Sequence, residues 1–175
     1  IIRKQAVLKA AALSMALFCV LFIPHAGTGS ADLLIPEVKS FTLDNGVKVF
    51  TISDELPRSE IIVSLSYGRL FEDGSNAGLS EVIAGTLLLS GSSRYPGDSL
   101  TDLLESAGGS ISVDAGWESI TISVKVIERH TGLAFDIIGD LVLNPLFNED
   151  SVKYSAGHVY EKHRRQMDDP AAKGM

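Results

Sequence analysis

Two hydrophobic periods alternate along this sequence, and their order constrains the fold more than any other feature. The stretch FTLDNGVKVFTI (41–52) reads as two strands joined by Asn45-Gly46, a pair that favours the tight turn of a β-hairpin. Period-two alternation returns in EIIVSLSYG (60–68) and again over 110–127, which predicts further strands. A break near 114–117 divides the last stretch into two strands.

Helical spacing of apolar residues occupies the segments between and after these strands. It predicts helices over 78–89, 99–109, 130–143 and 148–167, and the second of them begins at Ser99 and ends at glycines. The expected order is therefore β-β-β-α-α-β-β-α-α. This order predicts an α+β fold with a mixed, mainly antiparallel sheet and helices packed on it.

The N-terminal segment has the composition of a secretory signal peptide rather than of a folded domain. Arg3, Lys4 and Lys9 precede an apolar run over 10–23, and small residues follow up to Ala31. This pattern predicts a signal peptide over residues 1–31 with cleavage after Ala31. An uncleaved membrane anchor is the alternative, but the apolar run is short for a bilayer span.

Charge and cysteine content exclude several classes of function. Removal of the three positive charges of residues 1–31 takes the formal charge from −7 to −10, and an acidic exported chain is a poor nucleic-acid binder. The single cysteine, Cys19, lies in the apolar run, so residues 32–175 offer neither disulfides nor thiolate ligands. We expect an exported protein without a stable membrane span after cleavage, located in the bacterial periplasm, with secretion as the alternative.

The hexapeptide HVYEKH (158–163) brings two histidines and a glutamate onto one predicted helix. His158 and His163 are five residues apart, about 140° around a regular helix, so they cannot chelate one ion together. His163 falls on the apolar side of the helix and is expected to be a half-buried core residue. Glu161 lies on the opposite, polar side, which faces either a cleft or solvent.

A longer segment, AGLSEVIAGTLLLSGSSRYPGDSLTDLLESAGGSISVDAG (77–116), carries a resemblance to a known family. It resembles the N-terminal domain of the pitrilysin/insulinase zinc peptidases, which include the mitochondrial processing peptidases. The likeness extends to LDNGVKV upstream and to NPLF (144–147) and Asp-Asp-Pro (168–170) downstream. It implies that residues 32–175 are a peptidase-family N-terminal domain, which we expect to be truncated at its C-terminal end.

The resemblance also assigns positions to the family's inverted zinc motif H-x-x-E-H. The first zinc histidine falls on Glu81, the general-base glutamate on Ala84, the second histidine on Gly85, and the third ligand on Glu161. Active members use zinc, but this chain is expected to hold none and to have no intact catalytic residue, so it should be inactive alone. Glu81, Ala84 and Gly85 share one helical face, suited to close packing or to an empty groove.

Three hypotheses for function follow from the resemblance. The first is a non-catalytic homologue that pairs with an active H-x-x-E-H subunit or domain and encloses peptide substrates, with an exposed sheet edge as a means of docking. The second is an active metallopeptidase with substituted ligands, for which Glu81, Glu161 and His158 are the candidates. The third is an exported binding or assembly module without a proteolytic role.

Overall fold

The computed structural model describes residues 37–168, so the predicted signal peptide over 1–31 lies outside the described residues. The chain divides into two compact units between Asp54 and Glu55, which are described separately. The described part of the first unit is a hairpin of β1 (Val38–Thr42) and β2 (Lys48–Ile52). Gly46 has a φ of 85° in its turn, so the hairpin predicted at Asn45-Gly46 is confirmed.

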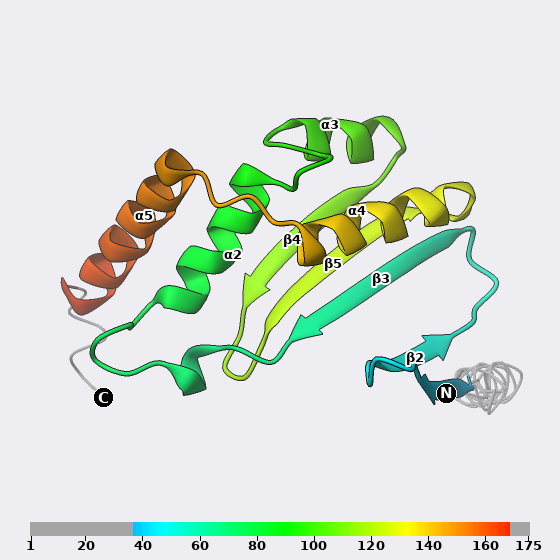
Figure 1. Cartoon of the computed structure of the whole chain (residues 1–175), viewed down its shortest axis with the longest axis horizontal. Coiled ribbons are helices and arrows are strands. Elements are labelled where there is room, and N and C mark those ends of the chain that lie inside the picture. Colours follow the sequence, from blue (N-terminus) through cyan, green and yellow to red (C-terminus); the bar gives the residue numbers. More distant parts are fainter. Residues whose placement is uncertain (1–36, 169–175) are drawn as a thin grey trace, which may run out of the picture. The chain divides into compact units, whose positions relative to one another are not determined.

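The second unit contains an antiparallel sheet of three strands. Its order is β3 (Arg58–Leu65), β5 (Ile120–Ile127) and β4 (Ser110–Ala115), with β5 in the centre (Figure 1). The turn between β4 and β5 comes slightly later than its predicted place near 114–117, because Ala115 still pairs with Ile120. Every second residue of β5 points into the core, as the period-two pattern predicted.

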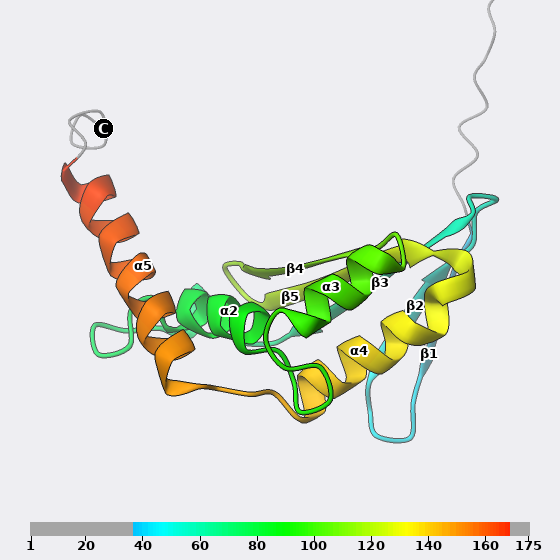
Figure 2. The same ribbon diagram turned by 90° about the horizontal axis from the view of Figure 1, so that it is seen from above.

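Helices cover one face of this sheet. They are α2 (Leu79–Ser90), α3 (Ser99–Ser106) and α4 (Thr131–Leu143), and Figure 2 shows all three on the same side. The 3₁₀ turns η1 (Arg69–Phe71) and η2 (Glu128–His130) precede α2 and α4. The helices and strands enclose a core of buried apolar side chains, of which the largest members are Leu100, Leu104, Ile122, Ile137 and Leu141. The predicted α+β fold is confirmed.

The last helix, α5 (Glu149–Asp168), packs on α2 and lies beyond the helices that cover the sheet (Figure 1). Ser155 and Val159 are its buried side chains. Tyr160 and Met167 are 65% and 67% exposed, so the apolar side of this helix is covered only in part. None of the helices within residues 37–168 has the length and apolar character needed to cross a membrane.

The second face of the sheet is mainly polar, although Ile62 of β3 is exposed on it. Lys125 of β5 forms an ion pair with Glu60 of β3 at 3.4 Å, and the Ser123 hydroxyl donates to the same carboxylate at 3.0 Å. Ser64 and Ser112 are exposed on the neighbouring strands. An antiparallel sheet with one apolar and one polar face is suited to bounding a water-filled space.

Candidate functional site

A close backbone contact fixes the segment that leads from β3 to α2. A Cβ atom at Gly68 would lie 2.6 Å from the Ser119 nitrogen and from the Trp117 oxygen, so only glycine allows the approach. The next two residues are tied to the same turn: the Arg69 N–H donates to the Gly116 oxygen at 3.2 Å and the Leu70 N–H to the Trp117 oxygen at 2.8 Å. This contact holds η1 against the β4–β5 turn and places Arg69 near α2.

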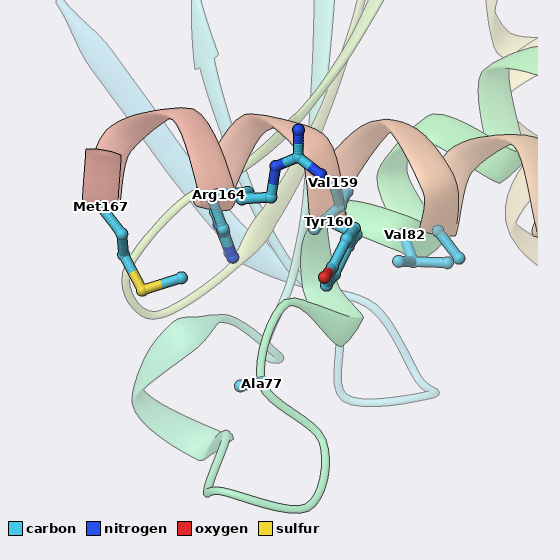
Figure 3. Close-up of a pocket in the computed structure, with 8 residues that line it drawn as sticks. Ala77, Val82, Val159, Tyr160, Arg164 and Met167 are labelled. Carbon is cyan, nitrogen blue, oxygen red and sulfur yellow. The ribbon is translucent and has the colours of Figure 1, made fainter. Parts of the chain in front are cut away.

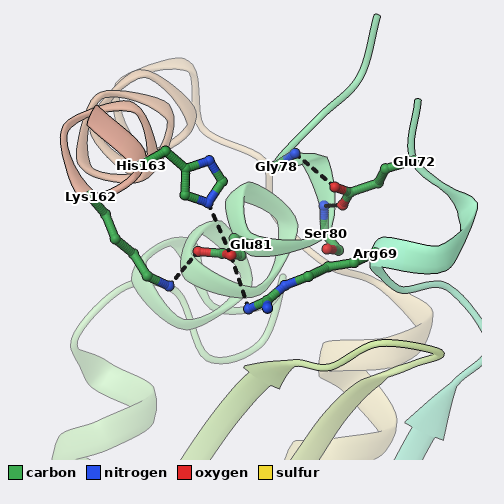
Figure 4. A network of polar contacts seen from close by, with 7 residues as sticks. All are labelled: Arg69, Glu72, Gly78, Ser80, Glu81, Lys162 and His163. Atoms are coloured by element: carbon green, nitrogen blue, oxygen red, sulfur yellow. Dashed lines mark hydrogen bonds and ion pairs between the residues drawn. The ribbon is translucent and has the colours of Figure 1, made fainter. Parts of the chain in front are cut away.

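The N-terminus of α2 is capped by a side chain from outside the helix. Gly78 occupies the N-cap position with a φ of 87° and has no side chain to accept a bond. Glu72 supplies the acceptors, because its two carboxylate oxygens accept from the backbone N–H groups of Gly78 and Ser80, each at 2.7 Å (Figure 4). The carboxylate also complements the positive end of the helix dipole.

We expect Glu72→Gln to lower the unfolding free energy by about 1 kcal/mol at neutral pH, the usual effect of losing an N-cap. Burial alone would raise the pKa of Glu72, but the hydrogen bonds from Ser80 and Gly78 and the charge of Arg69 outweigh it and hold the pKa below the ordinary 4.5. This contribution is therefore present above pH 4.5 and is lost as the pH falls through the folded pKa.

Urea unfolding of wild type and Glu72→Gln at neutral and acidic pH measures this contribution. The difference between the two proteins should shrink as the pH falls, because protonation removes the same charge from the wild type. Glu105→Gln, a change at an exposed glutamate of α3, is the control. A constant difference at all pH values would contradict the assigned role of the Glu72 carboxylate.

Glu81, one turn further along α2, lies at the centre of a cluster of basic side chains. Its Oε1 is 3.0 Å from Nη2 of Arg69 and 3.3 Å from Nε2 of His163, and its Oε2 is 2.6 Å from Nζ of Lys162 (Figure 4). These four residues are called the Glu81 cluster below. Burial raises the pKa of Glu81, but the bonds from Lys162 and His163 and the charges of Lys162 and Arg69 lower it below its ordinary value.

Ala84 and Gly85 continue the same face of α2, and they are closely packed. The Ala84 side chain is 4% exposed. A Cβ atom at Gly85 would lie 3.0 Å from the Ser155 hydroxyl oxygen of α5, which is tighter than ordinary contact. Of the two interpretations of this face, close packing is the correct one at Gly85.

Glu161 and His158, the residues of α5 in the hypothesis of substituted ligands, do not form a metal-binding group with Glu81 among the described residues. Glu161 lies 3.5 Å from Arg164 of its own helix and is 43% exposed, and His158 is exposed. Lys162 and His163 are the residues of α5 that reach Glu81. His163 is half-buried as predicted, but its assignment to the apolar core is wrong, because its ring nitrogen contacts a carboxylate.

A pocket of about 360 Å³ opens between α2 and α5 beside the Glu81 cluster (Figure 3). Its lining is mainly apolar and includes Val82, Val159, Tyr160 and Met167. His163 and Arg164 also line it. His163 therefore belongs both to this pocket and to the charged cluster.

Zinc does not fit the arrangement of these residues. A catalytic zinc needs three protein ligands whose lone pairs are directed at the ion. Both oxygens of Glu81 already face the cations of Arg69 and Lys162, which would repel a second positive ion. Across the described range 37–168, no three His, Cys, Asp or Glu side chains lie close enough to hold a metal ion.

Comparison with known proteins identifies the family. Residues 48–173 match the family described as Insulinase (Peptidase family M16). The chain belongs to this family. The resemblance inferred from the motifs of residues 77–116 is thereby confirmed for the family, and the placement of Glu81, Ala84 and Gly85 at its zinc-motif positions stays a prediction.

Relatives of this M16 chain include a protein named as a zinc protease and a subunit of the cytochrome b-c1 complex. It is 24% identical over 134 residues to the uncharacterized zinc protease YmxG of Bacillus subtilis, covering 76% of this chain and 32% of YmxG. It is 24% identical over 119 residues to human cytochrome b-c1 complex subunit 1, covering 68% of this chain and 25% of that subunit. The chain thus spans about a quarter to a third of these relatives.

The fold has a counterpart among solved structures. A protease from Helicobacter pylori superimposes with a TM-score of 0.71 at 17% sequence identity, over 79% of this chain and 34% of that one. At this level of identity the likeness establishes the fold.

Proposed function

We propose that this M16 chain is a non-catalytic homologue that pairs with an active H-x-x-E-H subunit or domain and helps to enclose and bind peptides. One observation carries the proposal. At the position of the first zinc histidine, Glu81 is held by Arg69, Lys162 and His163, and its carboxylate is already neutralised by protein cations.

The neighbouring positions support the same conclusion. Metal-assisted peptide hydrolysis needs a bound water that the ion polarises and a carboxylate that takes its proton. Ala84 offers a methyl group at the position of this base, and Gly85 offers no side chain at the position of the second histidine. Loss of the base alone typically lowers the rate by a factor on the order of 10²–10⁴.

A surface for peptide docking is available at the edge of the sheet. Among the strands of residues 55–168, β4 pairs only with β5, so one side of β4 has no strand partner. An extended peptide can add to such an edge through backbone hydrogen bonds. Because α2 packs against β4, a peptide on this edge would lie beside α2, the helix that carries Glu81.

An exposed apolar patch supports pairing with a second protein or domain. Trp117, Leu70 and Phe71 are 73%, 66% and 54% exposed. They are neighbours, because the Leu70 N–H donates to the Trp117 oxygen at 2.8 Å and Phe71 follows Leu70 in η1. Exposed apolar patches that contain tryptophan are typical of protein interfaces.

The other two hypotheses remain as alternatives with different support. The similarity to subunit 1 of the cytochrome b-c1 complex favours an assembly module without proteolysis as the second candidate. A rebuilt metal site of Glu81, Glu161 and His158 has less support, since Glu81 and Glu161 each contact cationic side chains. In all three cases we propose export to the periplasm, on the basis of residues 1–31.

Metal analysis and peptide cleavage by the full-length protein test the proposal. We expect well below one zinc ion per chain and no chelator-sensitive cleavage of an unstructured peptide by the protein alone. We also expect it to co-purify with a sibling that has intact H-x-x-E-H, and that sibling is the positive control for zinc. One tightly bound zinc per chain together with unaided cleavage would overturn the proposal, whereas an inactive protein without such a sibling would favour the assembly module.

A further inference from the structure

The Glu81 cluster contains more positive than negative charge. Arg69 and Lys162 are permanent cations, His163 is a third basic group, and Glu81 is the only carboxylate among the four residues. These four residues therefore have a net charge of at least +1 in a chain whose formal charge is −7. The neighbouring carboxylate of Glu72 also interacts with Arg69, but its oxygens are bound by the backbone N–H groups of Gly78 and Ser80. A local excess of this kind, rather than the net charge of the chain, determines which ligand a site attracts.

The cations are also the accessible part of the cluster. The side chain of Glu81 is 11% exposed, whereas those of Arg69 and Lys162 are 45% and 43% exposed. A guanidinium has five N–H donors and an ammonium has three, so both retain donors after binding Glu81. An approaching anion would meet these free donors before it met the buried carboxylate.

The position of Arg69 connects the cluster to the edge of the sheet. Its backbone N–H donates to the oxygen of Gly116, the residue that follows the end of β4 at Ala115. Figure 4 shows the Arg69 side chain running from η1 to Glu81, above strands of the three-stranded sheet. Arg69 therefore starts beside the end of β4, the strand whose free edge can accept an extended peptide, and its side chain reaches Glu81, where Lys162 also binds.

From these contacts we infer that Arg69 and Lys162 select peptides that place a carboxylate side chain near the C-terminal end of β4. The inference rests on the proposed peptide-binding function and specifies its substrate class as acidic peptides. Charge complementarity carries it: cationic side chains with free donors form hydrogen bonds to carboxylates that are stronger than those between neutral groups.

Binding of matched peptides to the full-length protein tests this inference. Two fluorescein-labelled, unstructured peptides differ only in having Glu or Gln at their central positions, and fluorescence anisotropy gives their Kd values. The Glu peptide should bind at least about tenfold more tightly at low salt, the size expected for a hydrogen bond to a charged group. The difference should shrink in high salt, because the cations are partly exposed.

Substitutions then identify the residues that cause the preference for the Glu peptide. Arg69→Gln with Lys162→Gln should reduce the preference for Glu over Gln to about threefold or less, and Lys162→Arg should retain it. Lys153→Gln is the matched control, since Lys153 is also on α5 and pairs with Glu149 at 2.6 Å, away from the cluster. If the double variant does not fold, the salt dependence in the wild type and the single Lys162→Gln variant decide the question.

The possible outcomes separate this inference from the proposed function. Equal binding of the Glu and Gln peptides, or a preference that Lys153→Gln removes as effectively as the cluster variants, overturns the inference but leaves peptide binding in place. Binding of neither peptide overturns both, whatever the zinc content. A Glu preference that depends on Arg69 and Lys162 supports both.

Discussion

Ala84→Glu, which places a carboxylate at the position proposed for the general base, is expected to destabilise the fold by about 3–5 kcal/mol, the usual cost of an uncompensated buried charge. Ala84 is 4% exposed and lies where α2 packs onto the rest of the unit. A carboxylate there loses its hydration and gains no cation, because Lys162 and Arg69 are already bound to Glu81. Urea unfolding of wild type and variant measures the loss, and a variant as stable as the wild type would show that the site is more open than described.

Gly85→His should add a steric cost of its own, about 1–3 kcal/mol for overpacking. The new side chain meets the Ser155 hydroxyl, which would lie 3.0 Å from its Cβ. Combining it with Ser155→Gly should recover part of the loss, a coupling that a double-mutant cycle detects. Gly157→His is the control, because a Cβ atom at Gly157 has nothing within 4 Å. Equal effects at Gly85 and Gly157 would contradict the close packing of α2 on α5.

Glu81→Gln is expected to lower the free energy of unfolding by about 1–2 kcal/mol. Three basic side chains lose their shared carboxylate, and two of them come from α5. The value is below the sum of three isolated contacts because Arg69 and Lys162 are 45% and 43% exposed. Backbone amides of α5 should also exchange faster with deuterium, since this helix is held mainly through α2.

Glu149→Gln provides a matched comparison for this change. Its carboxylate lies 2.6 Å from Nζ of Lys153, the same distance that separates Glu81 from Lys162, but the Glu149 side chain is 81% exposed. Exposed helical pairs contribute about 0.3–0.5 kcal/mol, so the loss should be small. If both variants lose the same unfolding free energy, the burial of Glu81 does not account for the stability that its cluster contributes.

Local patterns predicted the helices and strands of this chain closely. The alternation at Ile120, Ile122, Val124 and Val126 reflects the pleat of β5, which is a property of neighbouring residues. Asn45-Gly46 likewise specified its own turn. The later position of the β4–β5 turn depends on cross-strand pairing at Ala115, which a pattern within one strand does not contain.

The composition of the Glu81 cluster could not be predicted in the same way. Arg69 belongs to a 3₁₀ turn, and Lys162 and His163 belong to a helix far along the chain, so their meeting depends on how η1 and α5 pack around α2. The resemblance to the family indicated Glu161 as the remaining ligand position and placed Glu81 at the position of a lost zinc histidine. It gave no reason to expect that the neighbours of Glu161, rather than Glu161 itself, would reach across to α2.

Gly68 lies against the turn between β4 and β5 and directly precedes Arg69 of the Glu81 cluster, although it bears no functional group. Any larger residue would have to push the strand exit away from Ser119 and Trp117, which lie 2.6 Å from where its first carbon would stand. Such a shift would move the adjoining Arg69 as well and increase the distance from its guanidinium to the Glu81 carboxylate. The geometry of the Glu81 cluster therefore depends on a residue that has no side chain of its own.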